Sequence, residues 1–427
     1  MITRPLGFRA AGLAAGLKPS GKSDLALIVC DEVAEGTGAG GHRIEPRRSA
    51  AAVFTRNAVV GAPILIGRRW REAAGRGEGA ALRAVLVNAG AANAATGEEG
   101  VRDAEMCMEA VARALGCPVR EVLPCSTGVI GRRLSVERIV EAIPKLVSQL
   151  ARGEDADSAA ARSIMTTDLV PKSAHREIEL FGHQVHIGAI AKGSGMIAPQ
   201  LDSASGGPPH GTMLAFITTD AAIEHRALQK ALEWAARGSF DRISVDAHPS
   251  CSDTVIAMAS GAAPGRTLHE DMPEYHGFRA ALHSLCEQLA EQIVQDGEGA
   301  SRIFRVVVRG ARSESDAERM ARCVVDSPLV KCAVHGKDPN WGRIVTAAGN
   351  AGVPFDPLAT SLTIGGVEVY RRGVPTGTDK SDPRLRAAMG ADRVEMVLTV
   401  GDGPGSAWMM GCDLSAEYVR INADYTT

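Results

Sequence analysis

The sequence has 427 residues, of which 45% are hydrophobic but only 4% aromatic, and its formal net charge is −3. A chain of this length exceeds one small core, so two or more domains or lobes are expected. The near-balanced charge argues against nucleic-acid binding or membrane-surface attachment driven by electrostatics. A core with so few aromatic residues must consist of Ala, Val, Leu and Ile, which favours a mixed α/β protein.

The chain lacks the sequence signals of membrane and secreted proteins. No uninterrupted apolar run of about 18 residues is present, so we expect no transmembrane helix. The N-terminal segment has no sustained apolar region and is therefore a poor signal peptide. The nine cysteines are odd in number and include no C-x-x-C pair. We expect reduced thiols in a cytoplasmic protein, with no disulfide framework and no zinc site.

Short apolar runs alternate with amphipathic segments along the chain. The β-branched runs predict strands, apolar spacings of three and four predict helices, and Ser135 is a candidate N-cap. In chain order we expect strands at 25–30 and 84–87, helices at 105–115, 136–150, 227–236 and 278–294, a strand at 303–308, a helix at 314–325 and a strand at 394–400. Stretches 34–48, 200–210 and 375–384 are rich in Gly, Pro, Ser or charge and are expected to be surface insertions. The mixture predicts an α/β or α+β fold.

A glycine-rich stretch at residues 36–41 matches the pattern G-x-G-x-x-G. A dinucleotide site requires these glycines at the end of a strand and a helix directly after them. Here five residues separate the stretch from the strand, and the following HRIEPRR has no apolar helical face. An ordinary glycine-rich loop is therefore the better interpretation. The histidines lack metal-ligand spacing, so we expect no metal site.

The bond between Gly211 and Thr212 lies directly before an apolar, strand-like run. A threonine at a chain terminus carries its own general base, because its α-amine lies beside its hydroxyl and titrates near pH 8. The hydroxyl of Thr212 could create that terminus by attacking the carbonyl of Gly211, where glycine offers the least steric hindrance. Local chemistry leaves two interpretations open, which are self-cleavage and a loop that enters a strand.

Several longer blocks point to one family. They occur in order over the whole chain: VLPCSTGVIGRRL at 122–134, SIMTTDLVPK at 163–172, AIAKGSGMIAP at 189–199, TMLAFITTDA at 212–221, IVQDGEGASR at 293–302, GKDPNWGRIVTAAGNAG at 336–352 and YVRINADYTT at 418–427. With these blocks the chain resembles the ornithine acetyltransferases, also called glutamate N-acetyltransferases or ArgJ proteins. These enzymes cleave themselves and use the exposed threonine as nucleophile. The resemblance implies a DmpA/ArgJ-like layered α/β/β/α sandwich with two lobes.

The resemblance also implies an activity and the residues that carry it. The chain would split into fragments 1–211 and 212–427, which would stay associated as an α2β2 assembly. Thr212 would take an acetyl group from N-acetylornithine and pass it to glutamate in arginine biosynthesis, and some members of the family also accept acetyl-CoA. No cofactor, metal, nucleic acid or membrane is implied. The positions that match the family's site are Thr127 and Gly128 for the oxyanion hole and Thr166, Lys192, Glu298, Asn422 and Thr427 for substrate binding. The block around Asn340 is assigned to structural support near the site.

The sequence departs from the family pattern at positions that could shape substrate choice. Extra residues lie between Pro199 and Thr212, and the loop at 34–48 is longer than the family's. Two polar side chains of the family pattern are missing at 88–93, and the run at 246–254 is altered. Three alternatives therefore stay open. They are a paralogue acting on a different N-acyl amino acid, an amidohydrolase or aminopeptidase with the same nucleophile, and a scaffold protein that is never cleaved.

Overall fold

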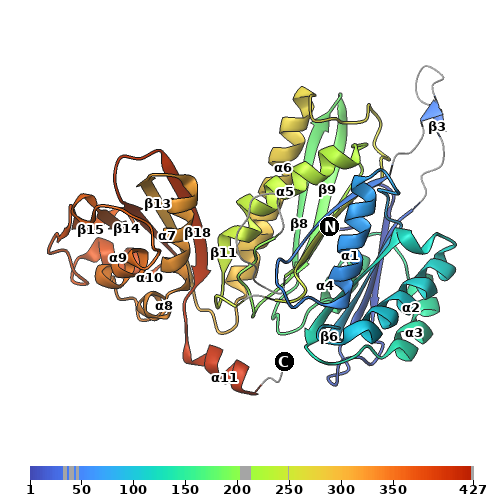
Figure 1. The fold of residues 1–427 in the computed structure, drawn as a ribbon, viewed down its shortest axis with the longest axis horizontal. Coiled ribbons are helices and arrows are strands. Elements are labelled where there is room, and N and C mark those ends of the chain that lie inside the picture. Colours follow the sequence, from blue (N-terminus) through green and yellow to red (C-terminus); the bar gives the residue numbers. More distant parts are fainter. Residues whose placement is uncertain (32–35, 38–42, 45–47, 202–212, 249, 425–427) are drawn as a thin grey trace. The chain divides into compact units, whose positions relative to one another are not determined.

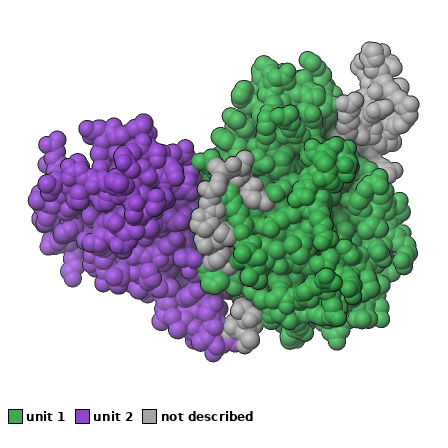
Figure 2. Space-filling view, viewed as in Figure 1, with its two compact units in different colours: residues 1–241, 248–293, 427 green, residues 242–247, 294–426 purple. Residues whose placement is uncertain are grey.

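The computed structural model describes residues 1–31, 36–37, 43–44, 48–201, 213–248 and 250–424. The chain divides into two compact units (Figure 2). The first comprises residues 1–241 and 248–293, and the second comprises 242–247 and the described residues from 294 onward. This division differs from the covalent fragments 1–211 and 212–427, which remain a prediction.

The first unit contains two main β-sheets (Figure 1). A four-stranded sheet has the order β1-β2-β6-β7, and a five-stranded sheet has the order β5-β12-β10-β9-β8. In the second sheet β10 lies at the centre, parallel to β12 and antiparallel to β9. The strands are β1 (Phe8–Leu13), β2 (Leu25–Cys30), β5 (Ser49–Phe54), β6 (Ala84–Ala91), β7 (Val122–Val129), β8 (Lys172–Leu180), β9 (His183–Lys192), β10 (Leu214–Thr219) and β12 (Thr254–Ala259), with a separate short pair of β3 (Gly36–Thr37) and β4 (Arg43–Ile44).

Helices cover these sheets and the sheets share one core. Helices α2 and α3 pack on each other and on the four-stranded sheet, and α5 packs on β5. Leu214 and Phe216 of β10 join Leu27 of β2 in a single hydrophobic cluster, so the two sheets are adjacent layers. The helices are α1 (Ala62–Gly75), α2 (Gly97–Leu115), α3 (Val136–Ser148), α4 (Glu154–Ser163), α5 (His225–Gly238) and α6 (Pro273–Gln295), with 3₁₀ turns at Val119–Glu121 and Phe240–Arg242. The predicted layered α+β class is confirmed.

The second unit is built on a seven-stranded sheet of order β11-β18-β13-β17-β14-β15-β16. Helix α7 packs on β13 and β18, and Val306 and Val308 of β13 meet Met320 of α7 in its core. The strands are β11 (Ile243–Ser244), β13 (Ile303–Ala311), β14 (Ser361–Ile364), β15 (Val367–Arg371), β16 (Val374–Pro375), β17 (Arg393–Thr399) and β18 (Gly405–Cys412). The helices are α7 (Glu314–Asp326), α8 (Pro328–His335), α9 (Trp341–Gly349), α10 (Pro383–Gly390) and α11 (Ala416–Asp424), with a 3₁₀ turn at Pro357–Ala359.

The predicted elements are present, and most are longer than expected. Helix α2 begins at Gly97 and α6 at Pro273, several residues before the predicted starts. The prediction missed these first turns because their residues are mostly polar or small and show no apolar spacing. Ser135 occupies the N-cap position of α3 as predicted, although its side chain makes no capping hydrogen bond with the described residues. Stretch 375–384 joins β16 to α10. Most of 34–48 and nearly all of 200–210 lie outside the described residues. No helix in the described part is long and apolar enough to cross a membrane.

Candidate active site

A tight approach of two glycines marks the end of the parallel strands β6 and β7. Gly128 lies opposite Gly90 in the register, with φ of +125°. A Cβ atom on Gly128 would lie 2.5 Å from the carbonyl carbon of Gly90, so only glycine fits there. The side chain of Asn88 supports this turn, accepting a hydrogen bond from Ser126 Oγ at 2.6 Å and donating to the Ala91 carbonyl at 2.9 Å.

Four of the predicted site residues meet at this turn. Lys192, the last residue of β9, is 2% exposed. Its ammonium group donates to Thr166 Oγ1 at 2.7 Å and lies 3.4 Å from Thr127 Oγ1. Thr127 directly precedes Gly128 on β7. The structure therefore gathers Thr127, Gly128, Thr166 and Lys192 into one corner, in which Thr127 and Lys192 are buried, although the roles of these residues remain predictions.

The charge of Lys192 is balanced by Asp168, a residue that sequence reasoning missed. Asp168 Oδ1 lies 2.7 Å from Lys172 Nζ, and Asp168 Oδ2 lies 3.8 Å from Lys192 Nζ. The carboxylate also accepts hydrogen bonds from the backbone of Gly193 at 2.7 Å and of Thr166 at 2.9 Å. Burial alone would disfavour the charged form, but the two ammonium groups outweigh it and hold the pKa of Asp168 well below its usual range. The Asp-x-x-x-Lys spacing was the one sequence signal available.

The start of strand β10 lies against this corner. Leu214 pairs with Lys192 in the register, and Met213, just before it, exchanges backbone contacts with the segment that leads into β12. The Met213 carbonyl accepts from Thr254 N at 2.9 Å, and the Met213 N–H donates to the carboxyl group of Asp253. Thr212 and Gly211, the predicted nucleophile and cleavage site, lie outside the described residues. Their roles stay predictions, and Met213, the residue after Thr212, is held by these two hydrogen bonds.

Asp253 is the second acidic residue that sequence reasoning missed. Its side chain is fully buried, and Oδ2 makes no hydrogen bond within the described part of the chain. Burial raises its pKa well above the usual range, even though the Met213 and Ser250 backbone N–H groups and the Lys192 ammonium favour the charged form. Only the fold could have revealed it, because its partner Met213 lies 40 residues away.

Two more predicted residues meet in the second unit. Asn422 of α11 donates a hydrogen bond from Nδ2 to Glu298 Oε2 at 2.7 Å. Glu298 lies in a turn whose next residue, Gly299, has φ of +70°, and a Cβ there would lie 2.5 Å from the Tyr418 backbone nitrogen. The Ser415 hydroxyl closes the turn by donating to the Gly299 carbonyl at 2.7 Å. Thr427, the remaining predicted substrate residue, lies outside the described residues.

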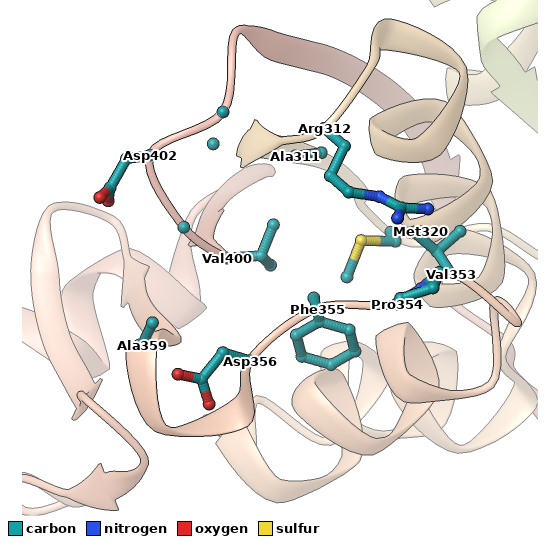
Figure 3. A pocket seen from close by; sticks show the side chains of 13 residues that line it. Ala311, Arg312, Met320, Val353, Pro354, Phe355, Asp356, Ala359, Val400 and Asp402 are labelled. Carbon is teal, nitrogen blue, oxygen red and sulfur yellow. The ribbon is translucent and has the colours of Figure 1, made fainter.

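A separate pocket of about 280 Å³ in the second unit contains none of the predicted site residues. Figure 3 shows Met320, Val353, Phe355 and Val400 lining it, with Asp356 and Asp402 on the loops around it.

The Asn340 side chain accepts from Arg343 N at 3.1 Å and caps α9, and the role of that block in supporting the site stays a prediction. Among the described residues, no group of three or more acidic, His or Cys side chains could hold a metal ion.

A threonine hydroxyl, a glycine N–H in a tight turn and a buried lysine form the kind of donor set that stabilises the oxyanion of acyl transfer. Comparison with known proteins defines the chain further. The model of the ArgJ family matches residues 9–427. The chain is 41% identical to the chloroplastic arginine biosynthesis bifunctional protein ArgJ of Physcomitrium patens, covering 100% of this chain and 78% of that protein. It is equally 41% identical to the ArgJ protein of Thermosynechococcus vestitus, covering 100% and 98%.

Among solved structures, ArgJ from Bacillus halodurans is 40% identical and covers 49% of this chain and 97% of its own, with a TM-score of 0.47. The overall arrangements agree too weakly for this likeness to add to the sequence match. The family match over nearly the whole length is sufficient by itself. The chain belongs to the ArgJ family. It is an acyltransferase of arginine biosynthesis.

Proposed function

We propose that this chain cleaves itself between Gly211 and Thr212 and then moves an acetyl group from N-acetylornithine to glutamate through an ester on Thr212. The observation that carries the proposal is the position of Lys192. Its ammonium group lies between the hydroxyls of Thr127 and Thr166, and its backbone pairs with the strand that begins two residues after Thr212. Cationic and hydroxyl donors thus converge beside the start of β10, the strand that follows the proposed nucleophile in the sequence.

Self-cleavage follows from the same donors. The Thr212 hydroxyl attacks the carbonyl carbon of Gly211, and the resulting oxyanion is stabilised by the Thr127 hydroxyl and the Gly128 N–H. The amide nitrogen then leaves as the free α-amine of Thr212, and water hydrolyses the ester that remains. The fragments would stay together, because β9 of the first fragment and β10 of the second are paired from Leu214 opposite Lys192 to Thr219 opposite Ile187.

Acetyl transfer uses the site twice. The α-amine of Thr212 takes the proton of its own hydroxyl, and the oxygen attacks the acetyl carbonyl of N-acetylornithine. The proton passes to the departing amine, and ornithine leaves. The amine of glutamate then attacks the ester, which releases N-acetylglutamate and restores the hydroxyl. Lys192 and Thr166 would bind the substrate in the first unit, and Glu298, Asn422 and Thr427 would bind it from the second fragment. Acetyl-CoA is proposed as an additional donor.

The decisive experiment combines intact mass with an exchange assay. Purified wild type should give two fragments, the second beginning at Thr212, and should transfer acetyl from N-acetylornithine to glutamate. Thr212→Ala should remain a single chain and lose at least about 10³-fold in rate, because both reactions need the hydroxyl. An uncut wild type whose activity survives Thr212→Ala would contradict the proposal, and an uncut wild type without activity would favour the scaffold alternative.

The assay also separates this function from the hydrolase. Release of free acetate that outpaces acetyl exchange would favour the amidohydrolase or aminopeptidase. Exchange with a different N-acyl amino acid would favour the paralogue, for which the alanines at 89 and 91 are one motivating departure.

The assembly and the compartment are parts of the same proposal. Light scattering should give the mass of two cleaved chains if the assembly is α2β2. A cytoplasmic location agrees with nine cysteines that are all free of disulfides in the described part. The chloroplastic relative makes a plastid the alternative to test.

A further inference from the structure

A partly buried lysine, Lys18, lies against the glycine turn at the ends of β6 and β7. A Cβ atom on Gly90 would lie 3.6 Å from Lys18 Cγ. Gly90 lies opposite Gly128 in the register. Thr127, the residue before Gly128, has its hydroxyl oxygen 3.4 Å from the Lys192 ammonium. Lys18 therefore belongs to the same corner of the first unit as Lys192, although the sequence blocks assign it no role.

The backbone of Lys18 is held in place by Asp24, whose side chain is fully buried. Asp24 Oδ2 accepts hydrogen bonds from the backbone N–H groups of Leu17 at 2.6 Å and Lys18 at 2.9 Å, and its Oδ1 accepts from Ala15 N at 2.7 Å. The Asp24 carbonyl accepts from Ala89 N of β6 at 2.8 Å. The loop that carries Lys18 is thus tied through its backbone to the strand that ends in the glycine turn.

The ammonium group of Lys18 has donors to spare. A lysine ammonium can donate three hydrogen bonds. Within the described residues that of Lys18 donates to one acceptor, the Ser23 carbonyl at 2.6 Å, and forms no ion pair. Burial lowers the pKa of Lys18 from its usual value, the carboxylates of Asp24 and Asp168 oppose this shift, and the Lys192 ammonium adds to it. A partly desolvated cation with unused donors is suited to an anionic ligand.

The charges around Asp168 leave an excess of positive charge. Asp168 lies 2.7 Å from Lys172 Nζ and 3.8 Å from Lys192 Nζ. Its charge also acts on Lys18, so three ammonium groups share this carboxylate. The buried carboxyl group of Asp253 offsets little of the excess, because burial raises its pKa and favours the neutral form. One further carboxylate, supplied by a ligand, would balance this corner.

We propose that Lys18 is a substrate-binding residue that, together with Lys192, binds the α-carboxylate shared by N-acetylornithine and glutamate. This inference rests on the proposed acetyl transfer and adds a residue to the site. The two substrates use the site in turn and differ in their side chains, so a group that binds their common carboxylate serves both half-reactions. A carboxylate has two oxygens and can accept hydrogen bonds from both ammonium groups at once. Thr127 and Gly128 then remain for the oxygen of the acetyl group.

The test removes the carboxylate from the ligand and the charge from the lysine in turn. Ornithine and 1,4-diaminobutane differ only by the carboxylate, and their affinities are measured by calorimetry without an acetyl donor. Wild type should bind ornithine about 10²-fold more tightly, because two charged contacts are at stake. Lys18→Met should lower the affinity for ornithine by about tenfold and leave that for 1,4-diaminobutane unchanged.

The matched control is Lys22→Met, which removes an exposed lysine from the same loop and should keep the full preference for ornithine. Lys18→Gln is a second variant, in case Lys18→Met does not fold, because it is neutral but keeps a donor for the Ser23 carbonyl. In the exchange assay both Lys18 variants should raise KM for N-acetylornithine and for glutamate by about tenfold. Their kcat should stay close to wild type, because Lys18 contacts no reacting atom.

The outcomes separate this inference from the proposed function. Folded Lys18 variants that keep the preference for ornithine, beside a wild type that exchanges acetyl, would overturn the inference alone. A fall in kcat with unchanged KM would do the same, because it would give Lys18 a structural role in place of a contact with the carboxylate. A wild type that binds neither compound and exchanges no acetyl would overturn both.

Discussion

The parts of the candidate site in the two units are built differently. In the first unit Thr127, Asp168 and Lys192 are buried, and the Lys192 ammonium lies 3.4 Å from Thr127 Oγ1 and 3.8 Å from the Asp168 carboxylate. In the second unit Glu298 meets Asn422, which lies on α11, a fully described helix with no buried residue. The first arrangement is the more rigid and holds the residues proposed as donors for the oxyanion, whereas the second can adapt. Substitutions in the first should therefore affect stability and rate together, and those in the second mainly substrate binding.

The largest effect is expected from Asp168→Asn. The change leaves the ammonium groups of Lys172 and Lys192 buried without their counter-charge, and breaking a buried pair in this way costs about 3–5 kcal/mol. The measurement is the free energy of unfolding in urea. The control is Asp31→Asn, whose carboxylate pairs with Arg9 at 2.6 Å but is partly exposed, so the loss should be within about 1 kcal/mol. Equal losses in the free energy of unfolding would mean that the contacts around Asp168 hold the first unit no more strongly than the partly exposed pair of Asp31 and Arg9 does.

The same variant predicts a pH dependence with a definite sign. The folded pKa of Asp168 lies below the unfolded value of about 3.9, so its contribution to stability is complete above that pH. The contribution is lost as the pH falls from about 4 toward the folded pKa. The stability difference between wild type and Asp168→Asn should therefore be constant from pH 5 to 8 and shrink in more acidic buffer. A difference that grows on acidification would contradict the assigned direction.

Gly128→Ala should mainly damage the chemical step. The added methyl group would collide with Gly90, and the alanine would have to adopt a φ near +125°. The turn must therefore shift, and the Gly128 N–H that is proposed to bind the oxyanion would shift with it. We expect a loss of about 10²–10³-fold in kcat, with little change in KM. Gly131→Ala is a matched control, because Gly131 also has positive φ, +78°, but no described atom lies within 4 Å of its Cβ position. That variant should retain near-normal kcat.

The paired lysines offer a smaller and more specific test. Lys172 and Lys192 both approach Asp168, but Lys172 otherwise reaches the Val170 carbonyl at 3.3 Å, whereas Lys192 reaches Thr166 and Thr127. Both Lys→Met variants should lose stability to a similar degree. Only Lys192→Met should also raise KM for N-acetylornithine, by about tenfold or more, because it removes a charged contact to the substrate. An equal rise in KM for both variants would show that the effect comes from disturbing Asp168, which both lysines contact, and not from a direct contact between either lysine and the substrate.

The sequence pointed to the first-unit positions through the blocks that resemble one family. Thr127 and Gly128 lie in the block at 122–134 and Lys192 in the block at 189–199, and their local patterns alone would indicate an ordinary turn and an ordinary lysine. Asp168 and Asp253 could not be found in the same way. The partners of Asp168 are brought together by the register of β8 with β9, and that of Asp253 by the approach of Met213 to the segment before β12. A buried charge is recognisable only when the side chains and backbone groups that surround it are known.

The fold shows the same limit. Strands such as β2 and β13 were predictable because a run of buried, β-branched residues needs no distant information. The central place of β10 depends on which strands it pairs with. This pairing puts β9, which precedes the predicted cleavage bond in the sequence, and β10, which follows it, side by side in one sheet. The helix starts were missed where the first turn is polar. At Ser135 a favourable residue type did not produce the hydrogen bond, because the position of the backbone decides whether the hydroxyl can reach.

The smallest effect is expected from Asn422→Ala, and it tests the adaptable side of the comparison. Removing the amide that donates to Glu298 at 2.7 Å should cost about 1 kcal/mol or less in stability, because α11 is exposed and water can replace the donor. If the pair positions Glu298 for substrate, KM should rise several-fold while kcat and self-cleavage stay close to wild type. Arg420→Ala, which removes only an exposed pair with Glu417 on the same helix, is the control and should change neither constant. A fall in kcat or in cleavage with Asn422→Ala would show that the second-unit pair takes part in the chemistry, and the division between a rigid chemical side and an adaptable binding side would no longer hold.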